Sequence, residues 1–174
     1  MEVYNPAEDS QFFSSFLRGY LSKNKRKILF LDVGTGSGIL AETALEFLPA
    51  KNIFACDINK EAVKEAKRKG INSFYSDLFS NVEGEFDLIT FNVPYLPRDS
   101  REPKDSAVAT TGGKKGDEIS IKFLKEAKKH LKEGGRIFLL ISSLTPRERI
   151  DKFVSKVVAK KKLWMEELII LEFR

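Results

Sequence analysis

Lys27 to Leu48 read KILFLDVGTGSGILAETALEFL, and this stretch combines three patterns in a fixed order. Four consecutive apolar residues, 28–31, are typical of a strand that is buried on both faces. Leu40, Ala44 and Leu48 follow at four-residue steps, which predicts a helix. Between the strand and the helix lie three glycines at alternate positions, which permit positive φ and close approach of a ligand to the helix N-terminus. The stretch therefore favours the first strand, turn and helix of a nucleotide-binding fold over an ordinary tight turn.

The glycine turn also narrows the choice of ligand. A dinucleotide fingerprint would need its third glycine where Ile39 stands, and the Gly-Lys-Ser/Thr of a P-loop is absent. An acid two residues before the first glycine, as Asp32 stands to Gly34, suits a ligand with an ammonium group. The pattern resembles motif I of class I methyltransferases, which bind S-adenosylmethionine. This resemblance implies that Asp32 faces the methionine part of the cofactor and that Gly34 and Gly36 bind it through the backbone.

The composition limits the class of protein. The chain has 174 residues, which suits one domain with a proper core, and its formal net charge of +5 permits but does not require an RNA-bound or ribosomal partner. The single cysteine, Cys56, excludes an internal disulfide and a cysteine-based zinc site, and with one histidine we expect no intrinsic metal centre. No apolar stretch reaches membrane-spanning length and no signal-peptide pattern is present, so we expect a cytoplasmic protein without membrane contact.

Asp57 ends a second predicted buried strand, 52–57, and lies 25 residues after Asp32, about the length of one strand–helix–strand unit. A carboxylate at this position can accept hydrogen bonds from both ribose hydroxyls of a nucleoside. The alternative role, a helix cap, is already filled by Asn59. We therefore predict that Asp57 binds ribose.

Asp77 and Leu78 follow a third predicted strand, 72–75. An acid in this place would be unremarkable by itself, but its position after the third strand makes a binding role more plausible. The methyltransferase resemblance implies that Asp77 contacts the adenine amine and that the backbone of Leu78 meets the adenine ring.

A fourth predicted strand, 86–91, runs directly into Asn92, Val93, Pro94 and Tyr95. This turn resembles the Asn-Pro-Pro-Tyr motif of methyltransferases that modify planar nitrogens, either amides or exocyclic base amines. Because the lone pair of an amide nitrogen is delocalised, the site must hold the NH₂ group at the methyl donor. The Asn92 oxygen and the Val93 carbonyl can each accept one N–H, and Tyr95 offers an aromatic face. Such positioning accounts for up to roughly 7–11 kcal/mol of barrier in well-oriented systems.

Val93 departs from the motif, since it stands where the first proline is expected. The backbone carbonyl is retained, and Pro94 still favours an extended conformation at Val93. One rigid ring is lost, which predicts weaker preorganisation. The alternative interpretations are a simple proline-containing turn and a cofactor-binding scaffold without activity.

The chain start carries a third motif, Tyr-x-Pro-x-Glu-Asp-Ser, which ends at Ser10. It resembles the N-terminal signature of the HemK family, single-domain archaeal and eukaryotic type. The resemblance implies that residues 1–22 form a helical segment over the methionine end of the cofactor, and that Ser10 and Asn92 touch the cofactor there. The polar segment 98–117 lacks periodicity and follows the Asn92 turn, so we predict a loop on the substrate side.

The remaining patterns predict the overall architecture. We expect a helix over 117–132 that Gly134 and Gly135 terminate, a strand over 136–142, a capping box at Thr145 before a short helix, and a terminal β pair at 154–162 and 167–173. Together with the earlier units they predict a single domain, 1–174, with a Rossmann-like class I methyltransferase fold. Its sheet would be seven-stranded and mostly parallel with one antiparallel strand, and helices would cover both faces.

The HemK resemblance covers nearly the whole chain and implies a specific activity. It indicates an S-adenosylmethionine-dependent N-methyltransferase of a protein glutamine, the target being the Gly-Gly-Gln loop of a class 1 translation release factor. It also implies a small zinc-binding activator subunit. The alternative is an RNA or DNA amino-methyltransferase with the same Asn-x-Pro-Tyr chemistry. The chain start and the lack of a concentrated basic, aromatic-rich face argue against direct nucleic-acid binding.

Overall fold

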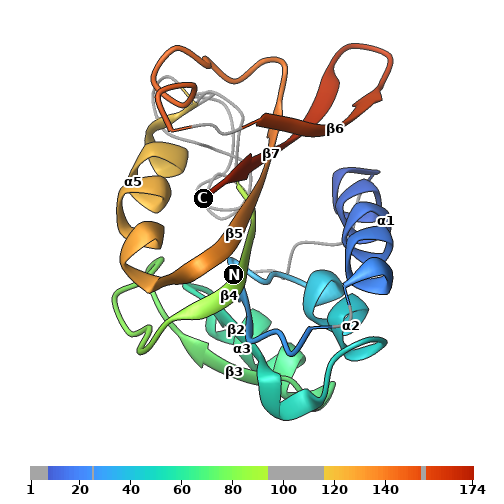
Figure 1. Ribbon diagram of the computed structural model, residues 1–174, viewed down its shortest axis with the longest axis vertical. Coiled ribbons are helices and arrows are strands. Elements are labelled where there is room, and N and C mark those ends of the chain that lie inside the picture. Colours follow the sequence, from blue (N-terminus) through green and yellow to red (C-terminus); the bar gives the residue numbers. More distant parts are fainter. Residues whose placement is uncertain (1–7, 25, 94–115, 154–155) are drawn as a thin grey trace.

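A computed structural model of the protein describes residues 8–24, 26–93, 116–153 and 156–174. Within these residues seven strands form one sheet. The strands are β1 (Phe30–Val33), β2 (Ile53–Asp57), β3 (Asn72–Tyr75), β4 (Phe86–Asn92), β5 (Leu131–Ser142), β6 (Lys156–Lys162) and β7 (Glu167–Phe173). Their order across the sheet is β3-β2-β1-β4-β5-β7-β6 (Figure 1).

The sheet is parallel from β3 to β5, and β7 alone runs antiparallel to its neighbours β5 and β6. This confirms the predicted sheet of mostly parallel strands with one antiparallel strand. Because parallel strands end at the same edge, Asp32, Asp57 and Asn92 all come to the carboxyl edge of the sheet, where open α/β sheets bind ligands.

Helices cover both faces of the sheet, as predicted. The helices are α1 (Glu8–Lys23), α2 (Ile39–Leu45), α3 (Lys60–Arg68) and α5 (Glu118–Ala127), with short 3₁₀ turns η1 (Ala50–Asn52) and η2 (Lys128–His130). α1 and α2 lie on one side of the sheet and α5 on the other (Figure 1). Apolar side chains of α1, α2 and α3 form a core with one face, and those of α5 form a second core with the other. Within the described part of the chain, every helix falls short of the length and apolar character needed to cross a membrane.

Apolar side chains along one face of α1 pack this helix against the sheet. Phe13 and Leu17 are fully buried, and the rings of Phe16 and Tyr20 each meet Phe138 edge-on at 4.9 Å. Aromatic pairs in this geometry add to the stabilisation that burial already provides. The N-terminal end of α1 is thereby held close to the carboxyl end of β4.

The prediction of a helix over 117–132 that ends at two glycines is wrong at its C-terminal end. The α-helix ends at Ala127, a 3₁₀ turn follows, and β5 begins at Leu131. Leu131 pairs with Phe86 of β4 across an irregular step in the register, so the long-range ladder competes successfully with the local helix. Gly134 then adopts a positive φ of 72° within β5. The glycines accommodate a distortion of a strand and do not stop a helix.

The short helix predicted after Thr145 is also absent, because residues 143–153 form turns. One backbone bond of helical type, from Asp151 N–H to the Arg147 carbonyl at 2.7 Å, is not continued. Isolated helices this short are unstable in water, and tertiary contacts fix the segment instead. Ile150 is buried in the core, and Arg149 forms an ion pair with Asp117. The connection from β3 to β4, residues 76–85, likewise consists of turns.

Candidate functional site

The glycine turn after β1 has the positive φ values that its sequence permits. Gly34, Gly36 and Gly38 have φ values of 62°, 53° and 84°, all in the left-handed region that favours glycine. A Cβ atom on Gly34 would lie 2.7 Å from a ring carbon of Phe91, so no larger residue fits without displacing a core side chain. The turn therefore presents bare backbone at the carboxyl edge, which suits close approach of a ligand.

Asp32 is buried beneath this turn and is only 1% exposed. Its two carboxylate oxygens accept hydrogen bonds from the Thr35 hydroxyl at 2.7 Å and the Thr90 hydroxyl at 2.8 Å. Burial raises the pKa of Asp32 to about 7, although both hydroxyl groups act to lower it. Asp32 thus ties the glycine turn to β4. Its predicted position toward the methionine part of the cofactor stays a prediction.

Asp57 connects the second strand to the same turn. Its Oδ2 accepts the Gly36 N–H at 2.8 Å and its Oδ1 accepts the Asn59 N–H at 2.7 Å. Burial raises the pKa of the Asp57 carboxyl, against the lowering effect of these backbone N–H groups. Asn59 caps α3, as predicted, by accepting the Glu61 N–H. Since each carboxylate oxygen has a second lone pair, Asp57 keeps acceptor capacity for a ribose hydroxyl, which stays a prediction.

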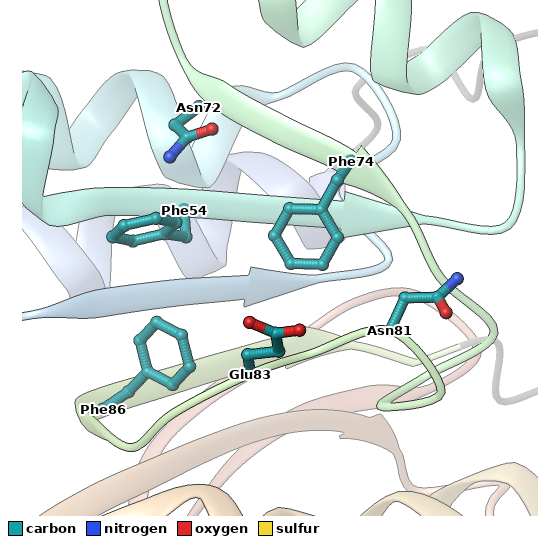
Figure 2. A pocket seen from close by; sticks show the side chains of 6 residues that line it. All are labelled: Phe54, Asn72, Phe74, Asn81, Glu83 and Phe86. Atoms are coloured by element: carbon teal, nitrogen blue, oxygen red, sulfur yellow. The ribbon is translucent and has the colours of Figure 1, made fainter.

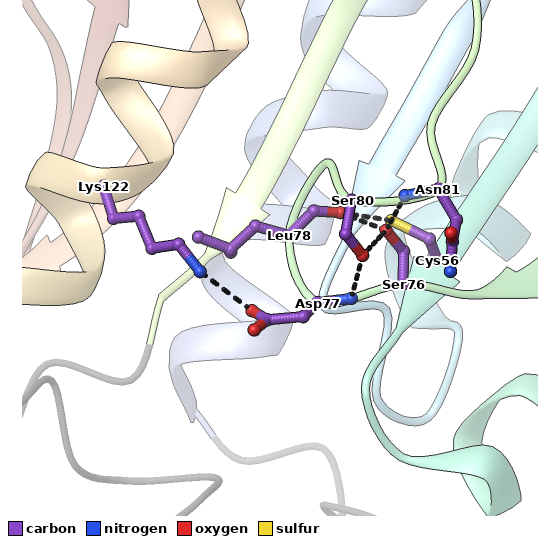
Figure 3. Close-up of polar contacts among 7 residues, drawn as sticks. All are labelled: Cys56, Ser76, Asp77, Leu78, Ser80, Asn81 and Lys122. Carbon is purple, nitrogen blue, oxygen red and sulfur yellow. Dashed lines mark hydrogen bonds and ion pairs between the residues drawn. The ribbon is translucent and has the colours of Figure 1, made fainter.

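Asp77 and Leu78 lie in the turn after β3, where Figure 3 shows their contacts. The exposed Asp77 carboxylate forms an ion pair with Lys122 of α5 at 3.2 Å. Leu78 has a φ of 50°, which is uncommon for a residue with a side chain. Its carbonyl accepts hydrogen bonds from the Ser76 hydroxyl at 2.7 Å and from the Cys56 thiol at 3.6 Å, which hold this conformation. The turn places Asp77 at the edge of the sheet, and its contact with adenine stays a prediction.

Asn92 ends β4 and contacts the first turn of α1. Its Nδ2 group donates to Asp9 Oδ2 at 3.1 Å and to Ser10 Oγ at 3.2 Å. Its Oδ1 atom is buried and has no hydrogen-bond partner among the residues that the structure describes. Because such an atom loses its hydration without compensation, it marks a place where an external donor would be stabilised. The structure thus brings the predicted residues Ser10 and Asn92 together.

The rest of the predicted catalytic turn is only partly described. The Val93 side chain is 1% exposed and packs in the core on the α5 side of the sheet. Pro94, Tyr95 and residues 98–115 of the predicted substrate loop lie outside the described residues. The last two residues of that predicted loop, Gly116 and Asp117, lead into α5.

A separate hollow of about 220 Å³ lies beside β3 and contains none of the predicted site residues (Figure 2). The rings of Phe54 and Phe86 meet in it at 5.7 Å. Its walls are Phe54, Asn72, Phe74, Asn81, Glu83 and Phe86. Phe54 and Phe74 are only partly buried there, and they pack against the same core as α5.

Three polar residues of the site were not identified from the sequence: Asp9, Thr35 and Thr90. Asp9 is part of the Glu-Asp-Ser motif, and its burial beside Asn92 gives it a role that the motif alone does not reveal. Thr90 is a polar residue in an otherwise apolar half of β4, and it points to Asp32. The signal in the sequence that could have identified it is a hydroxyl residue in a strand predicted to be buried, because a buried hydroxyl needs a hydrogen-bond partner.

The edge as a whole offers groups that fit an adenosyl cofactor with a methionine end. It combines a bare glycine turn, an acid at the end of β2, an acid just after β3, and an amide oxygen at the end of β4 that has no partner within the described part of the chain. Among the described residues, histidine, cysteine and acidic side chains form no group of three that could hold a metal ion.

Comparisons with known proteins agree with this geometry. Residues 10–166 match the family described as methyltransferase small domain. The chain is 41% identical over 98% of its length to a Methanocaldococcus jannaschii protein with the provisional name protein N5-glutamine methyltransferase, and covers 90% of it. It is 31% identical over 67% of its length to the release factor glutamine methyltransferase of Aquifex aeolicus and spans 47% of that protein. A 16S rRNA N2 G1207 methyltransferase of T. thermophilus, solved with AdoMet and guanosine, shares the fold at a TM-score of 0.68 and 17% identity, with 98% of this chain and 44% of that chain covered.

Proposed function

The chain belongs to the methyltransferase small domain family, and from this premise we propose that it methylates the side-chain amide of a glutamine in a protein. The methyl donor is S-adenosyl-L-methionine, which supplies a methyl group on a positively charged sulfur when it is bound. The observation that carries the proposal is the Oδ1 atom of Asn92 at the carboxyl edge of the sheet, which is buried and has no hydrogen-bond partner among the described residues.

The hydrogen bonds of Asn92 give this oxygen its direction. Because a carboxylate only accepts, the amide of Asn92 cannot turn over without losing the bond from Nδ2 to Asp9, although the Ser10 hydroxyl could donate to the turned amide. Its Oδ1 therefore stays available to accept one N–H of a target amide. An acceptor at that N–H orients the planar NH₂ group and favours the transfer of electron density to nitrogen. The site then acts through positioning rather than through a strong base.

Residues around the glycine turn would hold the cofactor. Gly34 and Gly36 offer backbone without side chains, and Asp57 has acceptor capacity for ribose hydroxyls. Asp77 is exposed near the start of the turn after β3 and can accept from an amine. Ser10 is 4% exposed and lies beside Asn92, which ends β4. In the sheet, β4 lies on one side of β1, and the strands β2 and β3 that lead to the two acids lie on the other side.

For the substrate we propose the glutamine of the Gly-Gly-Gln loop of a class 1 release factor. Two observations support this choice: the identity with the M. jannaschii protein over nearly the whole chain, and the identity with a release factor glutamine methyltransferase. An amide in an extended loop can reach an acceptor at a sheet edge without unfolding the protein that carries it.

We further propose that a small zinc-binding subunit covers the hollow beside β3. The phenylalanine rings of Phe54 and Phe74 are only partly buried there, and a partner that covers them would remove apolar surface from water. Purification from the native host tests this proposal. A chain that elutes alone and is fully active by itself would contradict it.

Labelling distinguishes the target classes. Purified protein, with the native co-purifying subunit if one exists, is incubated with S-adenosylmethionine labelled in the methyl group and with intact release factor, its Gln→Asn variant in the Gly-Gly-Gln loop, or total RNA. We expect label in the wild-type release factor and none in the variant. Label in RNA with none in either protein would refute the proposal.

A further inference from the structure

The turn between β6 and β7, residues 163–166 and here called the hairpin tip, exposes large apolar side chains. Trp164 is 94% exposed and Met165 is 76% exposed. Leu144, which is 51% exposed, lies next to the base of this turn, because the neighbouring Ser143 donates its N–H to the Glu167 carbonyl at 2.7 Å. An aromatic side chain of this size buries about 150–250 Å² in an interface, so this surface is costly to leave in water.

The hairpin tip is also an ordered turn. The Leu163 N–H donates to the Glu166 carbonyl at 2.8 Å and closes the turn. The Glu166 carboxylate accepts the hydroxyl of Ser142, which ends β5. These bonds fix the tip to the sheet, so the loss of conformational freedom on binding is small, as in preorganised interfaces.

The strand directions place the tip at the same edge as the site. Since β7 is antiparallel to both β5 and β6, β6 runs in the direction of β4, and Lys162 ends at the carboxyl edge like Asn92. Three strand spacings of about 4.8 Å separate β6 from β4, and the register places Lys162 roughly three residues, about 10 Å, beyond Asn92 along the strands. The tip therefore rises roughly 15–20 Å from the Asn92 oxygen. Figure 1 shows this turn projecting from the sheet on the side of α1.

A second contact links the hairpin to the site. Lys161 of β6 lies 3.7 Å from the carboxylate of Glu8, the residue that precedes Asp9 and Ser10 in α1. Three lysines, 160–162, lead into the tip, while the tip itself carries the acidic Glu166. Lys160 and Lys161 have carboxylate partners, whereas no carboxylate pairs with the exposed Lys162 among the residues that the structure describes. A protein that binds this surface would be stabilised by an apolar residue in contact with Trp164 and by an acidic residue paired with Lys162.

We propose that the hairpin tip, with Leu144, is the surface on which the protein substrate rests while its glutamine reaches Asn92. This inference rests on the proposed function, because it assigns the body of that protein substrate to the tip and its glutamine loop to the site. A loop that projects about 15–20 Å from a folded protein spans the separation. The tip then contributes to recognition of the intact protein and not to the reaction of the amide.

Comparison of a folded substrate with a peptide separates these two roles. Kinetic constants are measured for wild type, Trp164→Ala and Lys162→Glu with intact release factor and with a short peptide that contains its Gly-Gly-Gln loop. We expect each variant to lower kcat/KM for the intact protein about tenfold, through KM, and to leave the peptide reaction within twofold. Calorimetry should show the same tenfold loss in affinity for the intact protein and unchanged affinity for the cofactor.

Two exposed residues away from the edge serve as matched controls. Val157→Ala removes apolar surface at the other end of β6, and Lys67→Glu reverses a charge on α3, so both should leave all constants unchanged. Unchanged binding of intact release factor by Trp164→Ala, or an equal loss for protein and peptide, would overturn the inference while the proposed function stands. A wild type that labels no release factor overturns both. If it labels RNA and Trp164→Ala weakens that reaction tenfold, the tip binds nucleic acid and the inference is wrong.

Discussion

Replacement of Asp9 by alanine should slow methyl transfer without weakening cofactor binding. Asp9 Oδ2 accepts from the Nδ2 group of Asn92 at 3.1 Å, and both residues lie in the partly or fully buried zone at the end of β4. Without this acceptor only Ser10 Oγ, at 3.2 Å, holds the amide in place. The amide can then turn over and present NH₂ to the NH₂ of the target, which is an unproductive arrangement.

The structure sets the size of the effect. A hydrogen bond to a charged acceptor contributes about 1.5–3 kcal/mol, and 1.4 kcal/mol corresponds to a tenfold change, so the rate should fall roughly 10- to 150-fold. Asn92→Ala removes the positioning oxygen itself and should lower the rate by roughly two to four orders of magnitude. If the effect of Asp9 on the reaction passes through the bond to Asn92, the double variant should be no slower than Asn92→Ala. Asp9→Asn keeps an acceptor oxygen and should lose less than Asp9→Ala.

Single-turnover rates and cofactor affinity, measured on the same preparations, test this reasoning. Ser15→Ala is the matched control, because its exposed hydroxyl lies on the same helix and donates to the Gln11 carbonyl, away from Asn92. Thermal unfolding checks that α1 remains docked. The reasoning is refuted if Asp9→Ala keeps a rate within twofold of wild type, or if the losses of the two single variants add in the double variant.

Three further predictions concern the core of the site. Gly34→Ala should destabilise the protein by about 2–4 kcal/mol in urea unfolding, because its Cβ would meet the Phe91 ring at 2.7 Å and φ is positive. A second substitution, Phe91→Leu, should recover part of this loss, and a cost of Gly34→Ala below about 1 kcal/mol would contradict the geometry. The pKa of Asp32 is raised to about 7 in the folded protein against about 3.9 in the unfolded chain, so the stabilisation present below pH ~4 is lost as the pH rises to ~7. This contribution to the free energy of unfolding is about 4 kcal/mol, and a difference in that free energy between wild type and Asp32→Asn that is flat over this range would disprove it. Val93→Ala should cost about 2 kcal/mol of stability, since its side chain is buried. It should change the methylation rate little, since only its carbonyl is expected to face the substrate, and a roughly hundredfold slower variant with normal cofactor affinity would contradict this role.

Local patterns in the sequence were sufficient for the elements that local chemistry controls. The turn after β1 has glycine at every second position, and these three glycines adopt positive φ. Asn59 caps α3, as its place before the helix indicated. The alternation of apolar strands with helices then determined the parallel sheet and brought Asp57 and Asn92 to one edge. These features depend on backbone preferences and hydrophobic periodicity, which neighbouring residues carry.

Other features arose only from contacts between distant segments. Leu131 joined a strand instead of a helix because Phe86 of β4 pairs with it, and the backbone ladder outweighs a weak local preference. The bond between Asp9 and Asn92 joins residues 83 positions apart, and the bond between Thr90 and Asp32 joins residues 58 apart. The sequence by itself therefore determined which residue types reach the edge of the sheet. Only the tertiary structure decided that an acid from α1 directs the Asn92 oxygen, since hydrogen bonds of this kind depend on how helix and sheet pack.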